Sequence, residues 1–166
     1  MKLYLVRHGI AIDREDPKSP AEAERYLTAE GIKKTREVAR GVASLVEKPD
    51  LFLSSPYVRA VQTAELFASA MKYPKQKIRK TGLLLPGTDM TAFFRELAKS
   101  KDADSIFCFG HAPQLDEVIS AVLGSKRDGT SLKKAGIACI ELRRVAPPSG
   151  TLVWLATPKL LKKLGK

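Results

Sequence analysis

The chain contains two histidines, and each follows a short apolar run. His8 comes after Lys2–Val6 with Arg7 between them, and His111 comes after Ser105–Phe109 with one glycine between them. Apolar runs of this length and composition predict buried strands. Open α/β sheets bind their ligands at the carboxyl ends of their strands. We therefore expect both imidazoles to lie at one edge of a single sheet.

Two arginines add the capacity to bind an anion. Arg7 directly precedes His8, and Arg59 is expected in the first turn of a helix that follows another apolar run, Leu51–Leu53. A guanidinium offers paired donors and keeps its charge, and a helix N-terminus offers unpaired backbone N–H groups. A single arginine or histidine at such a position more often has a structural role. The four residues together at strand exits instead indicate a phosphoryl-binding site.

These residue types suit phosphoryl transfer through a covalent intermediate. A neutral His8 could attack phosphorus in line and give a phosphohistidine that water then hydrolyses. Nearby arginines would help to lower its pKa and keep it neutral. Arg7, Arg59 and a protonated His111 would stabilise charge on the equatorial oxygens through both steps. The histidines and cysteines show no metal-ligand spacing, so we expect neither a metal nor another cofactor.

The remaining sequence predicts alternating strands and helices that would position these residues. Thr28 is a candidate N-cap for an amphipathic helix whose inward positions include Val42 and Leu45, and the Ser54-Ser55-Pro56 segment is a candidate start of the next helix. This alternation predicts an α/β sandwich with a mostly parallel sheet, in one domain over residues 1–166. The last two strands are expected to pair antiparallel. Expected strands are 2–6, 51–53, 77–79, 105–109, 136–142 and 151–156, and expected helices are 28–47, 54–71, 88–98, 113–124 and one from 158.

Composition limits the function classes further. The chain is 44% hydrophobic and 28% charged, has no apolar stretch that could span a bilayer, and has no signal-peptide pattern, so we expect a cytoplasmic protein without a membrane partner. Lys and Arg number 29 against 18 Asp and Glu, which favours anionic partners. No nucleic-acid-binding motif accompanies these charges, so we do not expect a nucleic-acid partner. Cys108 and Cys139 are expected to be buried, reduced thiols.

Three motifs resemble the histidine phosphatase (phosphoglycerate-mutase-like) superfamily. They are LVRHG at 5–9, SSPYVRAVQTA at 54–64 and GHAP at 110–113. Segments 27–31 and 134–159 are also similar to the SixA-type phosphohistidine phosphatases within that superfamily. The resemblance implies a three-layer α/β/α sandwich and a phosphohistidine intermediate on His8. It also implies phosphate binding by Arg7, Arg59 and His111, with the backbone of Ala112 as a further candidate.

The sequence departs from the superfamily where a proton donor is expected. Larger members carry a glutamate or aspartate between the second arginine and the second histidine, and here Pro86 stands near that place. Asp89 is the nearest carboxylate, either as the acid or as a helix cap, and Glu15 and Asp13 are further candidates. Imidazole is a better leaving group than an alkoxide, so a phosphohistidine substrate needs less acid assistance.

These observations lead to one preferred function and two alternatives. We expect a metal-independent phosphatase, acting as a monomer, that removes phosphate from a histidine-phosphorylated protein such as a phosphotransfer domain or carrier. The same site could instead hydrolyse small phosphate esters or anhydrides. The chain could also be a basic binding module without catalytic activity.

Overall fold

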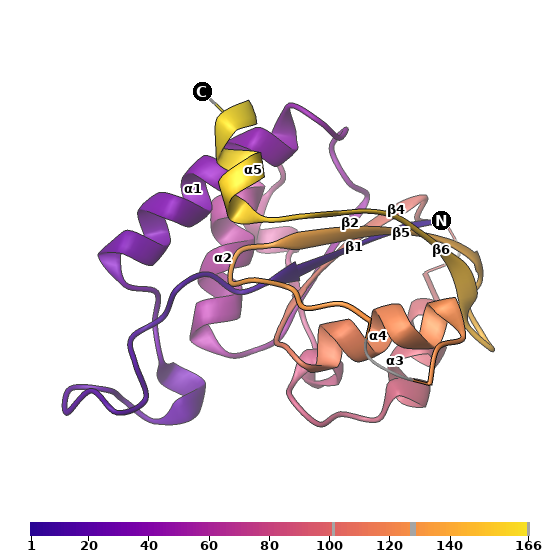
Figure 1. The fold of residues 1–166 in the computed structure, drawn as a ribbon, viewed down its shortest axis with the longest axis horizontal. Coiled ribbons are helices and arrows are strands. Elements are labelled where there is room, and N and C mark those ends of the chain that lie inside the picture. Colours follow the sequence, from indigo (N-terminus) through magenta and orange to yellow (C-terminus); the bar gives the residue numbers. More distant parts are fainter. Residues whose placement is uncertain (101, 127–128, 166) are drawn as a thin grey trace.

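A six-stranded sheet forms the centre of the protein, seen in a computed structural model that describes residues 1–100, 102–126 and 129–165 (Figure 1). The predicted domain bounds of 1–166 therefore end outside the described residues. The strand order is β3-β2-β4-β1-β5-β6. The strands are β1 (Lys2–Arg7), β2 (Leu51–Ser54), β3 (Arg79–Lys80), β4 (Ser105–Gly110), β5 (Ile137–Arg144) and β6 (Ser149–Ala156).

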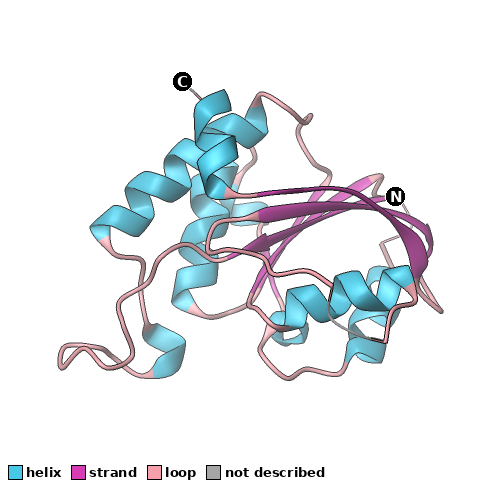
Figure 2. Cartoon of the chain, in the orientation of Figure 1, coloured by secondary structure: helices cyan, strands magenta, loops and turns pink. Residues whose placement is uncertain are grey.

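The first four strands are parallel, and the last two run antiparallel to their neighbours. β4 pairs in parallel with both β1 and β2, and β2 does so with β3. β5 pairs antiparallel with β1 and with β6. The predicted mixed, mostly parallel sheet is therefore confirmed (Figure 2).

Helices cover both faces of the sheet, as the predicted three-layer sandwich requires (Figure 1). On one face lie α1 (Ala29–Ala43), α2 (Val58–Ala70) and α5 (Pro158–Leu164). On the other lie α3 (Met90–Leu97) and α4 (Gln114–Leu123). Short 3-10 turns are η1 (Glu22–Glu24), η2 (Lys75–Lys77) and η3 (Gly82–Leu84).

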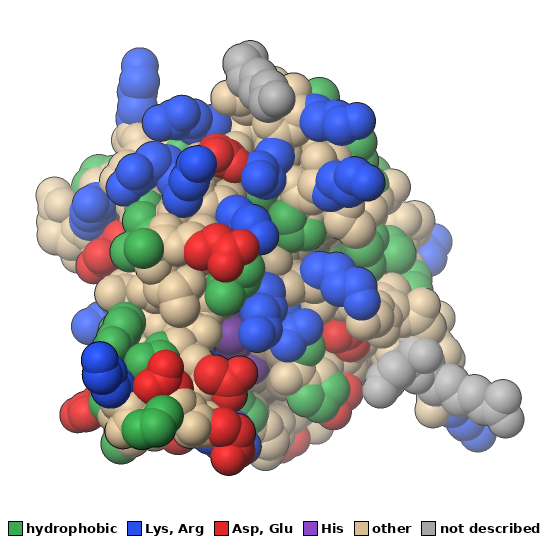
Figure 3. Space-filling model, turned by 60° about the vertical axis from the view of Figure 1, so that its left-hand side comes forward, with side chains coloured by type: hydrophobic (Ala, Val, Ile, Leu, Met, Phe, Trp, Pro, Cys, Tyr) green, Lys and Arg blue, Asp and Glu red, His purple; other side chains and the backbone are tan. Residues whose placement is uncertain are grey.

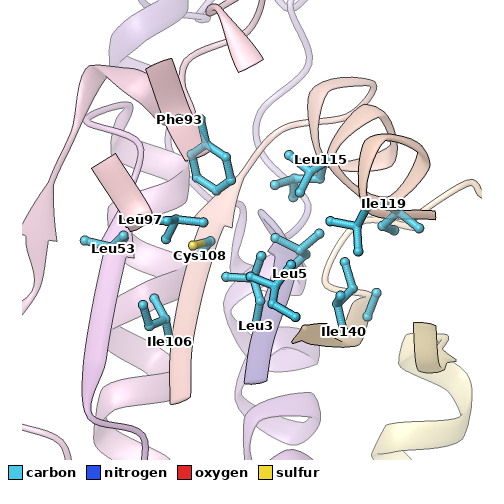
Figure 4. Close-up of a cluster of buried hydrophobic side chains, with 14 of the residues drawn as sticks. Leu3, Leu5, Leu53, Phe93, Leu97, Ile106, Cys108, Leu115, Ile119 and Ile140 are labelled. Atoms are coloured by element: carbon cyan, nitrogen blue, oxygen red, sulfur yellow. The ribbon is translucent and has the colours of Figure 1, made fainter. Parts of the chain in front are cut away.

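Every strand except the short, exposed β3 contributes alternate side chains to two separate cores, because successive side chains of a strand point to opposite faces. On β1, Leu3 and Leu5 enter the core under α3 and α4 (Figure 4). Tyr4 and Val6 enter the core under α1, α2 and α5. The sheet is thus held on both sides, which fixes the positions of its strand ends.

The structure confirms some predicted element boundaries and corrects others. The Thr28 hydroxyl accepts a hydrogen bond from the Gly31 N–H, so Thr28 is the N-cap of α1 as predicted. The predicted extension of this helix to residue 47 is wrong, because the Ser44 hydroxyl donates to the Gly41 carbonyl where the helix ends. Leu45, predicted to point inward, is 51% exposed.

The start of α2 differs most from prediction. The helix begins at Val58 with Tyr57 as its N-cap residue, and no side chain caps it. The predicted serine cap is wrong because Ser54 is the last residue of β2 and the Ser55 hydroxyl contacts His111 instead. The predicted edge strand exists as β3, but it begins at Arg79 because 75–77 form a 3-10 turn.

The sheet register brings three strand ends together. Ser54 of β2 and Val6 of β1 both pair with Phe109 of β4, and Arg7 pairs with Gly110. The His8 N–H continues this ladder by donating to the Gly110 carbonyl. Residues that follow these strands are therefore neighbours, although about fifty positions separate them in the sequence. None of the described helices is both long enough and apolar enough to cross a bilayer.

Gly31 lets α1 pack against the turn that follows His8. A methyl group at Gly31 would overlap the backbone carbonyl of Ile10, which cannot move like a flexible side chain. Gly→Ala inside a helix normally stabilises by about 0.5–1 kcal/mol, but here we expect Gly31→Ala to lower the free energy of unfolding by about 1–3 kcal/mol. Urea unfolding measures this. The control is Gly129→Ala, where the added methyl meets nothing within 4 Å. Equal stabilities of the two variants would contradict the prediction.

Candidate active site

His8 lies in the turn after β1, and the next residue fixes its ring. Its Nδ1 is 2.7 Å from the Gly9 carbonyl oxygen. A carbonyl only accepts, so Nδ1 carries the proton. Nε2 is then unprotonated and accepts a hydrogen bond from Arg59 Nε at 3.3 Å. Nε2 is therefore the nitrogen of His8 that can act as a nucleophile.

Arg59 is the second residue of α2, and its guanidinium has two occupied sides. Nη1 donates to the Glu22 backbone carbonyl and Nη2 donates to Glu22 Oε1, both at 2.7 Å. On the other side, Nε faces His8 Nε2, and Nη2 lies 3.4 Å from His111 Nδ1. Glu22 thus holds one end of the guanidinium while the Nε–Nη2 edge faces both histidines.

His111 follows β4 and lies close to His8, with ring centroids 5.1 Å apart. Its Nδ1 faces Arg59, which can only donate, so Nδ1 is an acceptor. The other nitrogen, Nε2, is 2.8 Å from the Ser55 hydroxyl and donates to it. The same hydroxyl accepts from the Tyr57 N–H. The histidine is therefore held in a neutral tautomer between β2 and α2.

Arg7 is positioned by a hydrogen bond to the 130–132 segment. Its Nη1 donates to the Leu132 carbonyl at 2.7 Å. That segment is held in turn by Asp116 of α4, whose Oδ1 accepts from the Leu132 N–H and the Thr130 hydroxyl. Within the described residues, the buried Nε of Arg7 has no hydrogen-bond partner. A buried guanidinium N–H without a partner is a donor available to an anion.

Burial and neighbouring charges keep both imidazoles neutral. Burial is the largest cause of a pKa of about 4 for His8, to which the charges of Arg59 and Arg7 also contribute, while the hydrogen bond to Gly9 acts in the opposite direction. Burial, followed by His8 and Arg59, lowers the pKa of His111 to about 3. The neutral His8 that nucleophilic attack requires is therefore provided at neutral pH. The protonated His111 considered above would need a phosphoryl dianion beside it, because a nearby negative charge favours the protonated ring.

Glu22 is the carboxylate that contacts this cluster, and sequence reasoning missed it. It lies in η1 and forms ion pairs with Arg14, Arg25 and Arg59. Burial raises its pKa, but the hydrogen bond from Arg25 and the charges of Arg59 and Arg25 lower it more. No sequence pattern marks Glu22, because its place depends on the path of the 13–25 loop.

The other predicted site residues have different surroundings. Asp89 is exposed and caps α3, with its carboxylate accepting from the Thr91 N–H. The Asp13 carboxylate accepts from the Glu15 N–H in the exposed first loop. Within the described residues, the carboxylates of Asp13, Glu15 and Asp89 have no hydrogen bond or ion pair to the arginine–histidine cluster. Ala112 lies in the turn between β4 and α4, next to His111, and its contact with phosphate stays a prediction.

Comparisons with known proteins agree with this fold. The family model of the histidine phosphatase superfamily (branch 1) matches residues 3–81. An uncharacterized protein from Picosynechococcus sp. is 34% identical over 167 residues, covering 97% of this chain and 99% of its own length. The protein histidine phosphatase SixA, in a structure with tungstate, has a TM-score of 0.84 at 22% identity, covering 97% of this chain and 99% of that chain.

Further structural likenesses extend to phosphatases named for different substrates. A putative phosphohistidine phosphatase SixA from Agrobacterium tumefaciens has a TM-score of 0.77 at 21% identity, covering 95% of this chain and 97% of that chain. A putative alpha-ribazole-5'-P phosphatase from Escherichia coli has a TM-score of 0.68 at 19% identity, covering 95% of this chain and 98% of that chain. The fold is thus shared among these enzymes.

The shared fold and the match to the family model identify this protein as a phosphatase, a hydrolase of phosphoryl compounds. The matched residues, 3–81, include β1, β2, α1 and α2. The chain belongs to the histidine phosphatase superfamily.

The depressed histidine pKa values predict how stability depends on pH. Between pH 6.5 and about 4 the unfolded chain binds protons that the folded chain does not, so stability falls as the pH is lowered. Each histidine should contribute a slope of up to about 1.4 kcal/mol per pH unit. Urea unfolding at several pH values measures this slope, and His8→Asn and His111→Asn should each reduce it. An unchanged slope in both variants would contradict burial of neutral imidazoles.

The Glu22 contacts predict a role in orienting Arg59. Glu22→Gln removes the negative charge that holds the guanidinium, so we expect kcat/KM for phosphoramidate to fall about tenfold, equivalent to about 1.4 kcal/mol. Steady-state kinetics measure this. The matched control is Glu24→Gln in the same 3-10 turn, which has no ion pair within the described residues and should retain wild-type activity. Equal activity of the two variants would show that Glu22 does not orient Arg59.

Proposed function

We propose that this protein is a metal-independent phosphohistidine phosphatase that acts on a protein through a phospho-His8 intermediate. The observation that carries the proposal is the unprotonated Nε2 of His8 beside the Nε–Nη2 edge of Arg59. That edge also faces His111. A nucleophilic nitrogen thus lies next to donors that suit the oxygens of a phosphoryl group.

The reaction has two displacements at phosphorus. In the first, His8 Nε2 forms a bond to phosphorus as the bond from phosphorus to the substrate's imidazole nitrogen breaks, and that nitrogen takes up a proton from solvent. In the second, water attacks phosphorus and releases one proton to solvent, the Nε2–phosphorus bond breaks, and inorganic phosphate leaves with His8 neutral again. The low pKa of His8 supports the nucleophilic role, because the ring needs no deprotonation first.

Three side chains would stabilise the transferring group. Arg59 offers its Nε–Nη2 edge, and Arg7 offers the buried Nε that has no partner within the described residues. His111 can donate from Nδ1 once a phosphoryl dianion favours its protonation. Such fixed donors act on charge that spreads over the equatorial oxygens during transfer.

The weak acid assistance in the site supports phosphohistidine as the substrate. Glu22 has a lowered pKa and is ionised at neutral pH, which makes it a poor proton donor. Asp89, the acid candidate from the sequence, is used as a helix cap. A phosphate ester needs a strong acid because its leaving group is an alkoxide, whereas imidazole leaves more readily. The likeness to SixA structures is in keeping with this choice.

A comparison of substrates tests the proposal. We expect a histidine-phosphorylated phosphotransfer domain to be hydrolysed with a kcat/KM at least about 100-fold above that for sugar phosphates, corresponding to about 2.7 kcal/mol. Activity should persist in the presence of EDTA. Sugar phosphates turned over as fast as, or faster than, the phosphorylated domain would overturn the substrate assignment.

The covalent intermediate can be followed in the same reaction. With ³²P-labelled substrate and an alkaline quench, label should appear on His8, because phosphohistidine survives alkali. His8→Ala should take up no label, and its near-wild-type fold can be checked by circular dichroism. Label on any other residue would disprove the mechanism.

A further inference from the structure

Two basic helices begin at the edge of the sheet where His8 lies. The Thr28 N–H, just before α1, donates to the Ile10 carbonyl, two residues beyond His8. α5 begins at Pro158, directly after β6, whose last residue pairs with Ile137. Ile137 pairs with Val6, close to the His8 turn. Both helices therefore begin at the sheet edge where β1 ends, α1 next to the turn that follows His8 and α5 two strands away from β1.

A surface hollow lies between these two helices and is lined mainly by cations. Its volume is about 730 Å³. Among the described residues that line it, Glu37 is the one with a carboxylate, and it forms an ion pair with Lys162. Within the described residues, Lys159 and Lys163 have no carboxylate partner. The lining side chains that carry a positive charge are Lys34, Arg40, Lys159, Lys162 and Lys163.

The charge on the face that contains the histidines is divided into two parts (Figure 3). Lys and Arg side chains predominate above the imidazoles in this view, with some acidic side chains among them, and acidic side chains predominate below. Large apolar side chains accompany the lysines, since Leu160 and Leu164 of α5 are 54% and 44% exposed. Exposed apolar groups among charges are typical of a protein-binding surface.

We propose that the hollow between α1 and α5 docks an acidic surface of the protein that carries the phosphohistidine. This inference rests on the proposed function, because it names the partner surface that would bring phosphohistidine to His8. The cations supply charge complementarity. Pro158 lines the hollow and follows the end of β6, which lies at the sheet edge where β1 ends before His8, so one end of the hollow is on the active-site side of the molecule. The acidic part of the same face would orient the partner by repelling its acidic surface.

Other anionic partners fit these features less well. Proteins that bind single-stranded nucleic acid stack bases on aromatic side chains, and the hollow has no aromatic side chain among its lining residues. A helix that lies on a membrane needs a long apolar face, whereas α5 has seven residues and buries Leu161 against the protein. A folded acidic protein can use both the lysines and the exposed leucines.

Charge reversal at exposed positions tests the docking surface. Lys159→Glu combined with Lys163→Glu should raise KM for an acidic, histidine-phosphorylated phosphotransfer domain about tenfold at low salt, with kcat nearly unchanged. The increase should shrink at high salt, because exposed charges are screened. Hydrolysis of phosphoramidate, which carries no protein surface, should stay at the wild-type rate.

The matched control is Lys48→Glu combined with Arg143→Glu, which makes the same change in net charge. Both residues are exposed, and they lie at the opposite end of the sheet, since Arg143 is at the far end of β5 and Lys48 precedes β2. Equal effects of the two double variants would overturn the proposal, because net charge alone would then explain them. Equal losses of activity toward phosphoramidate and toward the phosphorylated domain in the Lys159→Glu/Lys163→Glu variant would also overturn the proposal, since they would indicate a damaged active site.

Binding without turnover separates this inference from the proposed function. The unphosphorylated phosphotransfer domain should bind the wild-type protein more tightly than the Lys159→Glu/Lys163→Glu variant in isothermal titration calorimetry. Tighter binding to the wild-type protein would support docking even if the phosphorylated domain were not hydrolysed. A failure to hydrolyse that domain would refute only the substrate assignment. The double variant could instead lose binding to phosphatidylserine vesicles or to single-stranded DNA and still bind the phosphotransfer domain like wild type. That outcome would assign the surface to another partner and overturn the proposal.

Discussion

The site depends on the contacts of the Arg59 guanidinium with Glu22 on one side and with the two histidines on the other. One side of this buried cation is held by a carboxylate and a backbone carbonyl, and the other side faces His8 Nε2 and His111. A buried cation without such partners would be costly, and a freely rotating one would not present a fixed pair of donors. The same contacts join the 13–25 loop, α2 and the two strand exits into one unit. The chemistry of the site therefore depends on contacts among segments far apart in the sequence.

Much of the fold follows from local sequence patterns. Thr28 caps α1, Asp89 caps α3, and the antiparallel pairing of the last two strands matches the turn-rich segment between them. The convergence of Arg7, His8, Arg59 and His111 could be predicted because parallel strands end at one edge of a sheet. The strands and helices could be predicted because buried apolar runs and amphipathic periodicity are visible within windows of about ten to twenty residues.

The remaining features depend on contacts that no local pattern encodes. Glu22 reaches Arg59 only because the long polar loop folds back over the site, and a glutamate in such a loop looks like any solvated charge. Ser55 resembles a helix cap in sequence, yet its hydroxyl is used by His111 across the sheet edge. Asp116 is part of α4 but acts on Arg7 through the 130–132 segment. Tertiary hydrogen bonds of this kind override local propensity.

The hydrogen bond from His8 Nδ1 to the carbonyl of the adjacent Gly9 fixes the chemical identity of the proposed intermediate. Because this nitrogen keeps its proton, only one regioisomer of phosphohistidine can form, with phosphorus on Nε2. The restraint comes from two neighbouring residues and needs no distant group. A change in the length or charge of the surrounding loops would therefore leave the reacting nitrogen of His8 unchanged. The proposed nucleophile and the proposed docking surface thus depend on different parts of the structure.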